Sequence, residues 1–127
     1  QKILKLQANF SNTNISDLDF KNLNLPNTQW IGCWADHVNF YNSVLARSCL
    51  ISSNLESAVF KKADLQKCDF SRSYLVGADF EGANLEGADF ENCDLSGANF
   101  INAKITNANF KGAKLDGVIG LTSTKVL

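Results

Sequence analysis

Residues 78–90 read Ala-Asp-Phe-Glu-Gly-Ala-Asn-Leu-Glu-Gly-Ala-Asp-Phe, and this stretch repeats one five-residue unit without deviation. The unit is a small residue, then Asp or Asn, then Leu or Phe, then two variable residues. The same columns extend outward when the sequence is written in rows of five. Every fifth residue from Phe10 to Leu115 is apolar, and Ala35 alone among them is small. An internal repeat of this kind determines the architecture of the whole chain.

A period of five does not fit any straight element of secondary structure. In a β-strand, side chains alternate between faces, so large residues five positions apart would point to opposite sides. In an α-helix, five residues advance about 500°, which places each large residue about 140° from the previous one. We therefore expect short extended pieces whose small and large residues face inward. The two variable positions, where Gly and Asn are frequent, should form corners between these pieces.

The order of the large residues predicts how many sides the coil has. From Phe60 to Leu115 they alternate between Phe and an aliphatic residue. Three sides would mix the two kinds in every stack, whereas four sides place like on like every 20 residues. The sequence therefore predicts an all-β, four-sided parallel β-helix. Its predicted core stacks are Phe20, Phe40, Phe60, Phe80 and Phe100 on one wall, Phe10, Trp30, Leu50, Phe70, Phe90 and Phe110 on the opposite wall, and Leu25, Leu45, Leu65, Leu85 and Ile105 on a third.

The repeated unit over residues 8–117 resembles the motif of the pentapeptide-repeat proteins. The resemblance implies a right-handed four-sided β-helix, and the handedness follows from the resemblance alone. These 110 residues form 22 units of five, and four units per coil give five and a half coils. We expect residues 1–7 and 118–127, which flank the repeat, to be N-terminal and C-terminal caps or tails, because a solenoid must cover its two ends.

Residues 23–53 follow the motif least closely. Leu23 occupies a small-residue position, Pro26 lies at a corner, and Trp34 replaces the outward Asp or Asn. Ala35 replaces a large core residue, and the bulk of Trp30 is a candidate to fill the volume that it leaves.

Five apolar residues project outward near one corner and its adjoining wall, and they form a candidate partner surface. They are Ile31, Trp34, Ile51, Tyr74 and Val76. Trp34 and Tyr74 lie in one column, two coils apart. Exposed aromatic side chains rimmed by polar groups are typical of protein-binding surfaces. The alternative interpretation is a scatter of unrelated apolar residues on the surface.

Charged residues are grouped by coil. Lys61, Lys62, Lys67 and Arg72 fall in one coil and Glu81, Glu86 and Glu91 in the next. We expect ion pairs between the two coils, each contributing well under about 1 kcal/mol. In the alternative interpretation the cations form a basic band, extended by Arg47, that meets an acidic partner.

Catalytic and ligand-binding signatures are few. His37 is the one histidine and has no Cys or second His at metal-ligand spacing. The acidic residues occupy repeat positions on all four walls, and a convex rod offers no pocket in which to shift their pKa values. We therefore expect no enzyme activity, no cofactor and no metal.

The four cysteines are expected to be free thiols. Cys33 and Cys93 share an inward column but lie three coils apart, about 14 Å, which is too far for a disulfide. Cys68 should face inward and Cys49 outward. Free thiols favour a reducing cytoplasm.

Composition restricts the partners. Twelve basic and thirteen acidic residues give a net charge of −1, which does not favour direct binding to nucleic acid, and the apolar runs are too short for a membrane span. We expect a non-catalytic scaffold or protein–protein interaction module. The resemblance implies an alternative, a DNA-mimicking protein of the quinolone-resistance type that acts on gyrase, and it also implies a homodimer through the C-terminal end. The nearly balanced charge and the basic coil argue against DNA mimicry.

Overall fold

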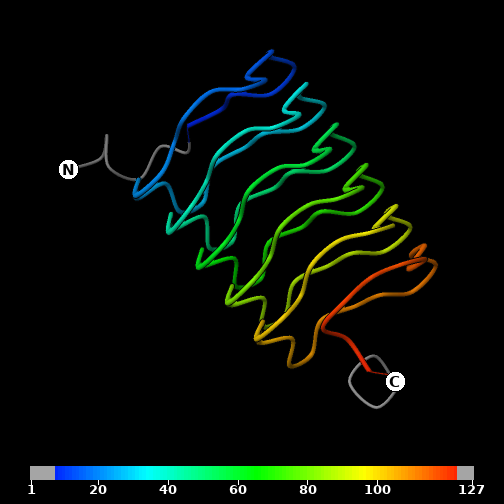
Figure 1. Ribbon diagram of the computed structural model, residues 1–127. Helices are drawn as coiled ribbons and strands as arrows, with labels where there is room; N and C mark the ends of the chain where they lie inside the picture. The colour runs from blue at the N-terminus through cyan, green and yellow to red at the C-terminus, as the bar shows by residue number, and fades with distance from the viewer. Residues whose placement is uncertain (1–7, 123–127) are drawn as a thin grey trace.

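The computed structural model describes residues 8–122, so the predicted N-terminal cap at 1–7 and residues 123–127 of the predicted C-terminal tail lie outside the described residues. The described chain is a stack of coils of like shape (Figure 1). It contains no α-helix, and its β-structure between residues 8 and 122 consists of single-residue parallel bridges. Each bridge joins a residue to the one 20 positions later, from Asn9–Gln29 to Asn99–Ile119. A coil therefore holds four five-residue units, which confirms the predicted four-sided parallel β-helix.

Each coil has four walls, which we name A to D, and the bridged residue is the middle one of each three-residue wall segment. Wall A is 23–25, 43–45, 63–65, 83–85 and 103–105; wall B is 8–10, 28–30, 48–50, 68–70, 88–90 and 108–110; wall C is 13–15, 33–35, 53–55, 73–75, 93–95 and 113–115; wall D is 18–20, 38–40, 58–60, 78–80, 98–100 and 118–120. The two residues between consecutive walls form a corner, named by the walls that it joins. Corner AB, for example, includes residues 46–47, 66–67, 86–87 and 106–107.

The corners explain the polar part of the repeat. The second corner residue has a positive φ at every corner from Asn12 to Gly117, between 54° and 63° where it is not glycine. Gly and Asn adopt this left-handed conformation at the lowest cost. The Asp or Asn of the wall caps the corner that follows it, because its Oδ1 accepts a hydrogen bond from the amide two residues later, as Asp79 does from Glu81 at 3.0 Å.

Backbone hydrogen bonds connect each coil to its neighbours on both sides. The amide of Phe80 donates to the carbonyl of Asn99 at 2.7 Å, and the amide of Asp79 donates back to the carbonyl of Ala58 at 2.9 Å. The second corner residue joins the same ladder, since the amide of Gly82 donates to Ile101 at 2.9 Å. All four walls therefore stack in strict register.

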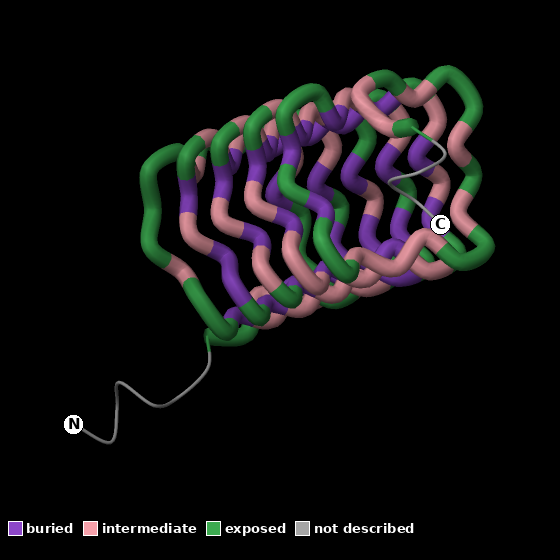
Figure 2. Tube along the Cα trace, turned by 90° about the horizontal axis from the view of Figure 1, so that it is seen from below, coloured by how far each residue is buried: buried purple, intermediate pink, exposed green. Residues whose placement is uncertain are grey.

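The core lies inside the coil, where the small and large residues of the unit face one another (Figure 2). Phe40, Phe60, Phe80 and Phe100 on wall D are fully buried, and consecutive rings stack, with 5.1 Å between the ring centroids of Phe60 and Phe80. The rings of wall B stack in the same way and meet those of wall D edge-on, as Phe90 meets Phe80 at 5.5 Å. On wall A, Leu45, Leu65 and Leu85 are fully buried, Ile105 is 8% exposed, and Leu25 is partly buried.

The irregular coil of residues 21–40 packs without an exposed gap. Trp30 and Ala35 are each 1% exposed. Trp30 stacks on Phe10 with ring centroids 4.3 Å apart, and its indole Nε1 donates to Thr28 Oγ1 at 2.7 Å. The largest and the smallest core residue therefore lie on adjoining walls of one coil, in agreement with local repacking.

The coil pattern continues past the predicted end of the repeat at residue 117. Ile119 bridges Asn99, and its amide donates to the carbonyl of Ala98 at 3.1 Å. The motif fails here because Val118 and Ile119 replace the small and polar residues, although the backbone keeps its path. Gly120 occupies the position of the large residue, where a Cβ would lie 2.3 Å from the amide nitrogen of Ile101. The C-terminal boundary predicted from the sequence is therefore too early.

We predict that Phe80→Ala lowers the free energy of unfolding by about 3–5 kcal/mol, because it removes a fully buried ring from two stacks of aromatic contacts. Phe20→Ala is the matched control, since Phe20 is only partly buried and its loss should cost clearly less. Urea denaturation followed by circular dichroism measures both. Equal losses in the two variants would contradict the described gradient of burial.

Candidate partner surface

Wall C carries the two most prominent aromatic side chains of the surface. Trp34 is 58% exposed and Tyr74 is 43% exposed. Bridges from Trp34 to Asn54 and from Asn54 to Tyr74 place them in one outward column. They are two coils apart, about 10 Å along the axis, and Asn54 lies between them. The two aromatic side chains therefore form two separate anchors along a line.

The other three residues of the candidate surface lie at the corners on either side of wall C. Ile31 and Ile51 occupy successive coils of corner BC, where Ile31 is 39% exposed and Ile51 is partly buried. Val76 lies at corner CD and is also partly buried. The structure therefore places all five residues around one wall, with three exposed and two half-buried. They form an interrupted strip.

Trp34 and Tyr74 stand where most units have the Asp or Asn that caps a corner. On the same wall, Asn54 accepts a hydrogen bond from the amide of Glu56 at 3.2 Å, and Asp94 accepts one from Ser96 at 3.0 Å. An aromatic side chain has no oxygen in that position. The amides of residues 36 and 76 therefore lose this acceptor, and the chain exposes a large apolar surface in its place.

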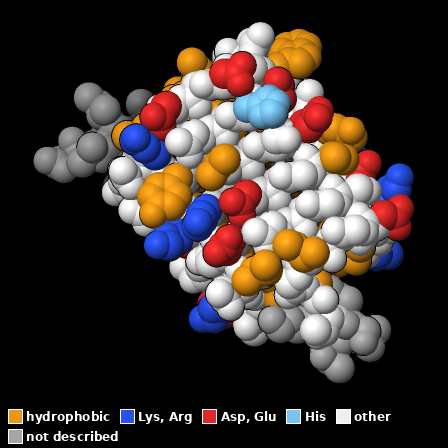
Figure 3. All heavy atoms as spheres, in the orientation of Figure 1, with side chains coloured by type: hydrophobic (Ala, Val, Ile, Leu, Met, Phe, Trp, Pro, Cys, Tyr) orange, Lys and Arg blue, Asp and Glu red, His pale blue; other side chains and the backbone are white. Residues whose placement is uncertain are grey.

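The rim of this surface is acidic. A hydrogen bond from the Ser16 hydroxyl lowers the pKa of Asp36, with a smaller contribution from the neighbouring His37. The hydroxyl and the amide of Ser96 lower the pKa of Asp94, which lies in the column of Tyr74. Both carboxylates are thus ionised at neutral pH. The histidine, pale blue in Figure 3, lies among red acidic side chains at corner CD.

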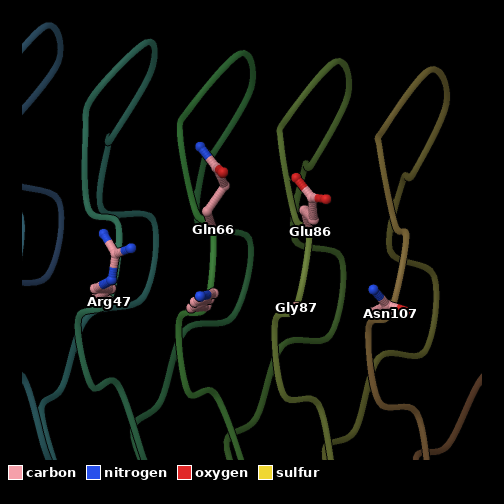
Figure 4. A pocket seen from close by; sticks show the side chains of 6 residues that line it. Arg47, Gln66, Glu86, Gly87 and Asn107 are labelled. Atoms are coloured by element: carbon pink, nitrogen blue, oxygen red, sulfur yellow. The ribbon is translucent and has the colours of Figure 1, made fainter.

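A second feature lies at corner AB, where six residues line an open groove of about 550 Å³. They are Arg47, Gln66, Lys67, Glu86, Gly87 and Asn107. They come from successive coils along one edge of the rod (Figure 4). Sequence reasoning included Arg47 and Lys67 in a basic band but missed the groove. The signal that it overlooked was the run of long cationic residues at corner positions that favour Gly or Asn.

The expected ladder of ion pairs between Lys61–Arg72 and the glutamates of the next coil does not form. Over residues 8–122 the ion pairs are Lys21–Asp19, Lys104–Glu86 and Lys114–Asp116, at 3.5–4.0 Å. The columns give the reason, because Lys62 and Lys67 are followed 20 residues later by glycines and Arg72 by an asparagine. The basic residues of that coil are therefore available to other charges.

The cysteines follow the predicted inward and outward pattern, and all four are free thiols. Cys33, Cys68 and Cys93 are buried, and their thiols donate to backbone carbonyls, as Cys93 does to Phe70 at 2.8 Å. Burial raises the pKa of Cys93 to about 12 and that of Cys68 still further. Cys49 is partly exposed on wall B, and its pKa is raised by partial burial.

Within the described chain, no group of three or more His, Cys, Asp and Glu side chains is arranged to hold a metal ion. No helix between residues 8 and 122 is long and apolar enough to cross a membrane.

Comparison with known proteins relates this geometry to others. The sequence model of the family described as "Pentapeptide repeat region" matches residues 43–119, which is more than half of the chain. No curated protein matches the sequence.

Solved structures share the fold at low identity. Rfr23, a pentapeptide repeat protein from the cyanobacterium Cyanothece 51142, has a TM-score of 0.64 and 22% identity over 89% of this chain and 84% of its own. A pentapeptide repeat protein from the thylakoid lumen of Arabidopsis thaliana has a TM-score of 0.62 and 24% identity over 89% and 71%. The fluoroquinolone resistance protein QnrB1 has a TM-score of 0.51 and 23% identity over 88% and 72%. All three likenesses are of fold.

We predict that a thiol reagent modifies Cys49 first in the folded protein. The three buried thiols are shielded and, for Cys68 and Cys93, have strongly raised pKa values, so their reactive thiolate fraction is negligible near neutral pH. Iodoacetamide labelling at pH 8, followed by peptide mass spectrometry, measures the order. In urea all four cysteines should react. Early labelling of Cys93 in the folded state would contradict the described burial.

Proposed function

The chain belongs to the pentapeptide-repeat family, and from that premise we propose that it is a non-catalytic interaction module that presents wall C to a protein partner. The partner inserts apolar groups between and beside Trp34 and Tyr74. Ile31, Ile51 and Val76 extend the contact over the two adjoining corners. Asp36 and Asp94 add charge at its rim.

The observation that carries this proposal is the exchange of two corner caps for exposed aromatic rings. A typical hydrogen bond contributes about 0.5–1.5 kcal/mol to stability, and exposed Trp and Tyr gain nothing from the fold. Large aromatic residues bury much area on binding at a small cost in conformational entropy. The exchange is therefore unfavourable in the isolated rod and favourable in a complex.

A rigid rod suits such a role. Each coil is bonded to the next, and among residues 8–122 every buried polar side-chain atom has a hydrogen-bond partner. The outward columns therefore hold their side chains at fixed separations, so that little ordering is left to be paid on binding. The described surface offers open grooves and no enclosed site for chemistry, which supports a function without catalysis.

We predict that Trp34→Asn/Tyr74→Asn abolishes capture of the wall C partner and leaves the fold at least as stable as the wild type, because Asn restores both corner caps. The measurement is affinity capture with the purified chain from the lysate of its own source, with thermal unfolding run in parallel. Tyr41→Ala, which alters a partly buried tyrosine at corner DA, is the control. Retention of every captured protein by the Asn variant would remove the proposed surface.

One observation favours the alternative of DNA mimicry. The coil 81–100 carries five carboxylates and no cation: Glu81, Glu86, Asp89, Glu91 and Asp94. The acidic surface is limited to that coil, because Lys61, Lys62, Lys67 and Arg72 precede it and Lys104, Lys111 and Lys114 follow it. A duplex mimic needs a continuous negative surface, so we rank this function second.

We therefore predict that the protein neither inhibits gyrase supercoiling nor protects gyrase from a quinolone. Supercoiling assays with and without the drug, over a range of protein concentrations, test this directly. Protection at low protein concentration would reverse the ranking of the two functions.

A further inference from the structure

The groove at corner AB holds two cations stacked one above the other. Arg47 and Lys67 occupy the same corner position in successive coils, about 4.8 Å apart along the axis. Both are exposed, and neither forms an ion pair with a residue of the described chain. Glu86 also lines the groove, but Lys104 pairs with it at 3.5 Å. Two like charges thus stand side by side without a close counter-charge.

These cations also stand in an unfavourable backbone conformation. From residue 47 to residue 72, six successive corners lack Gly, Asn and Asp at the left-handed position, and four of the six residues there are cations. The six are Arg47, Ser52, Ser57, Lys62, Lys67 and Arg72, with φ of 56–63°. Among the other corners described, His37 is the one exception to Gly, Asn and Asp. The left-handed conformation is costly for long side chains, and such strain is often retained at functional positions.

The lining of the groove indicates the chemistry of its ligand. The corner amides are not free to bind an anion, because the amide of Arg47 donates to Gln66 at 2.8 Å and the amide of Lys67 donates to Glu86 at 2.9 Å. A phosphate site built on backbone amides is therefore absent at this corner. The cationic side chains and the Asn107 amide remain as donors. Arg and Lys side chains without amide support are well suited to carboxylates.

The surrounding charges limit the size of the ligand. Glu81, Glu86 and Glu91 lie on the next coil around three corners and would repel a long uniform polyanion such as nucleic acid. A short acidic segment can place its carboxylates at Arg47 and Lys67 and leave neutral groups facing the glutamates. The position matters too, because corner AB is diagonally opposite corner CD, on the far side of the rod from the corner that borders wall C.

We propose that the groove at corner AB binds a short acidic segment of a protein partner, whose carboxylates contact Arg47 and Lys67. The site is separate from wall C and does not depend on the function proposed for that wall. With both sites in use, the rod binds two different proteins, one through aromatic anchors and one through cations.

The test uses the full chain and a fluorescein-labelled peptide of ten glutamates, with binding followed by fluorescence anisotropy at low ionic strength. Arg47→Asn/Lys67→Asn should weaken binding by at least about tenfold. Lys21→Asn/Lys111→Asn removes the same charge elsewhere on the rod and is the matched control, which should bind as the wild type does. The Trp34→Asn/Tyr74→Asn variant should also bind the peptide normally, so that this site and wall C are tested independently.

Four outcomes would overturn the proposal. They are no binding of the peptide by the wild type, equal losses in the two charge variants, tighter binding of a single-stranded decanucleotide than of the peptide, and complete displacement of the peptide by inorganic phosphate at matched ionic strength. Thermal unfolding separates loss of the site from loss of the fold. Asn suits the left-handed corners better than Arg or Lys, so the Arg47→Asn/Lys67→Asn variant should melt at or above the wild-type temperature. A lower melting temperature would contradict the argument from strain.

Discussion

The structure depends on a left-handed backbone residue at every corner. This residue turns the chain after each three-residue wall, and its amide donates to the coil that follows, as Gly82 does to Ile101. Four such turns bring the chain back after 20 residues, so each side chain lies directly above its counterpart. Like therefore stacks on like, which produces the parallel rings of wall D and the aliphatic column of wall A. The core is a consequence of how the corners are made.

The same constraint separates positions that maintain the fold from positions that can vary. Inward residues are restricted to small or large apolar types, and the occasional inward Ser or Cys bonds to a carbonyl of the preceding coil, as Ser53 does to Trp30 at 2.7 Å. The outward wall position and the second corner position each have a preferred residue but tolerate others. Both candidate sites use this tolerance. Wall C exchanges corner caps for aromatic rings, and corner AB exchanges Gly or Asn for cations, so each site lowers the stability of the rod.

The sequence was sufficient to predict the fold, because a period of five and an alternation of Phe with Leu are incompatible with other arrangements. Inward and outward positions followed from the same register, so the places of Trp34, Tyr74 and Cys49 were predictable. Features that depend on side-chain reach or on backbone path were not. The ion pairs between coils failed because corner cations lie below Gly or Asn, the groove at corner AB required the shape of the edge, and the repeat continued through Val118 and Ile119 although their side chains do not match the motif.

The 20-residue coil also bears on how such a chain can change in length. A deletion or duplication of 20 residues, wherever it begins, returns each remaining side chain to its own column. A change of five residues rotates every later unit by one wall and places Phe above Leu throughout. Genetic events that keep the core intact therefore come in whole coils, and each one moves wall C residues and corner AB residues apart or together by about 4.8 Å. Recombination within the repeat can thus adjust the distance between two binding surfaces in uniform steps while the interior remains the same.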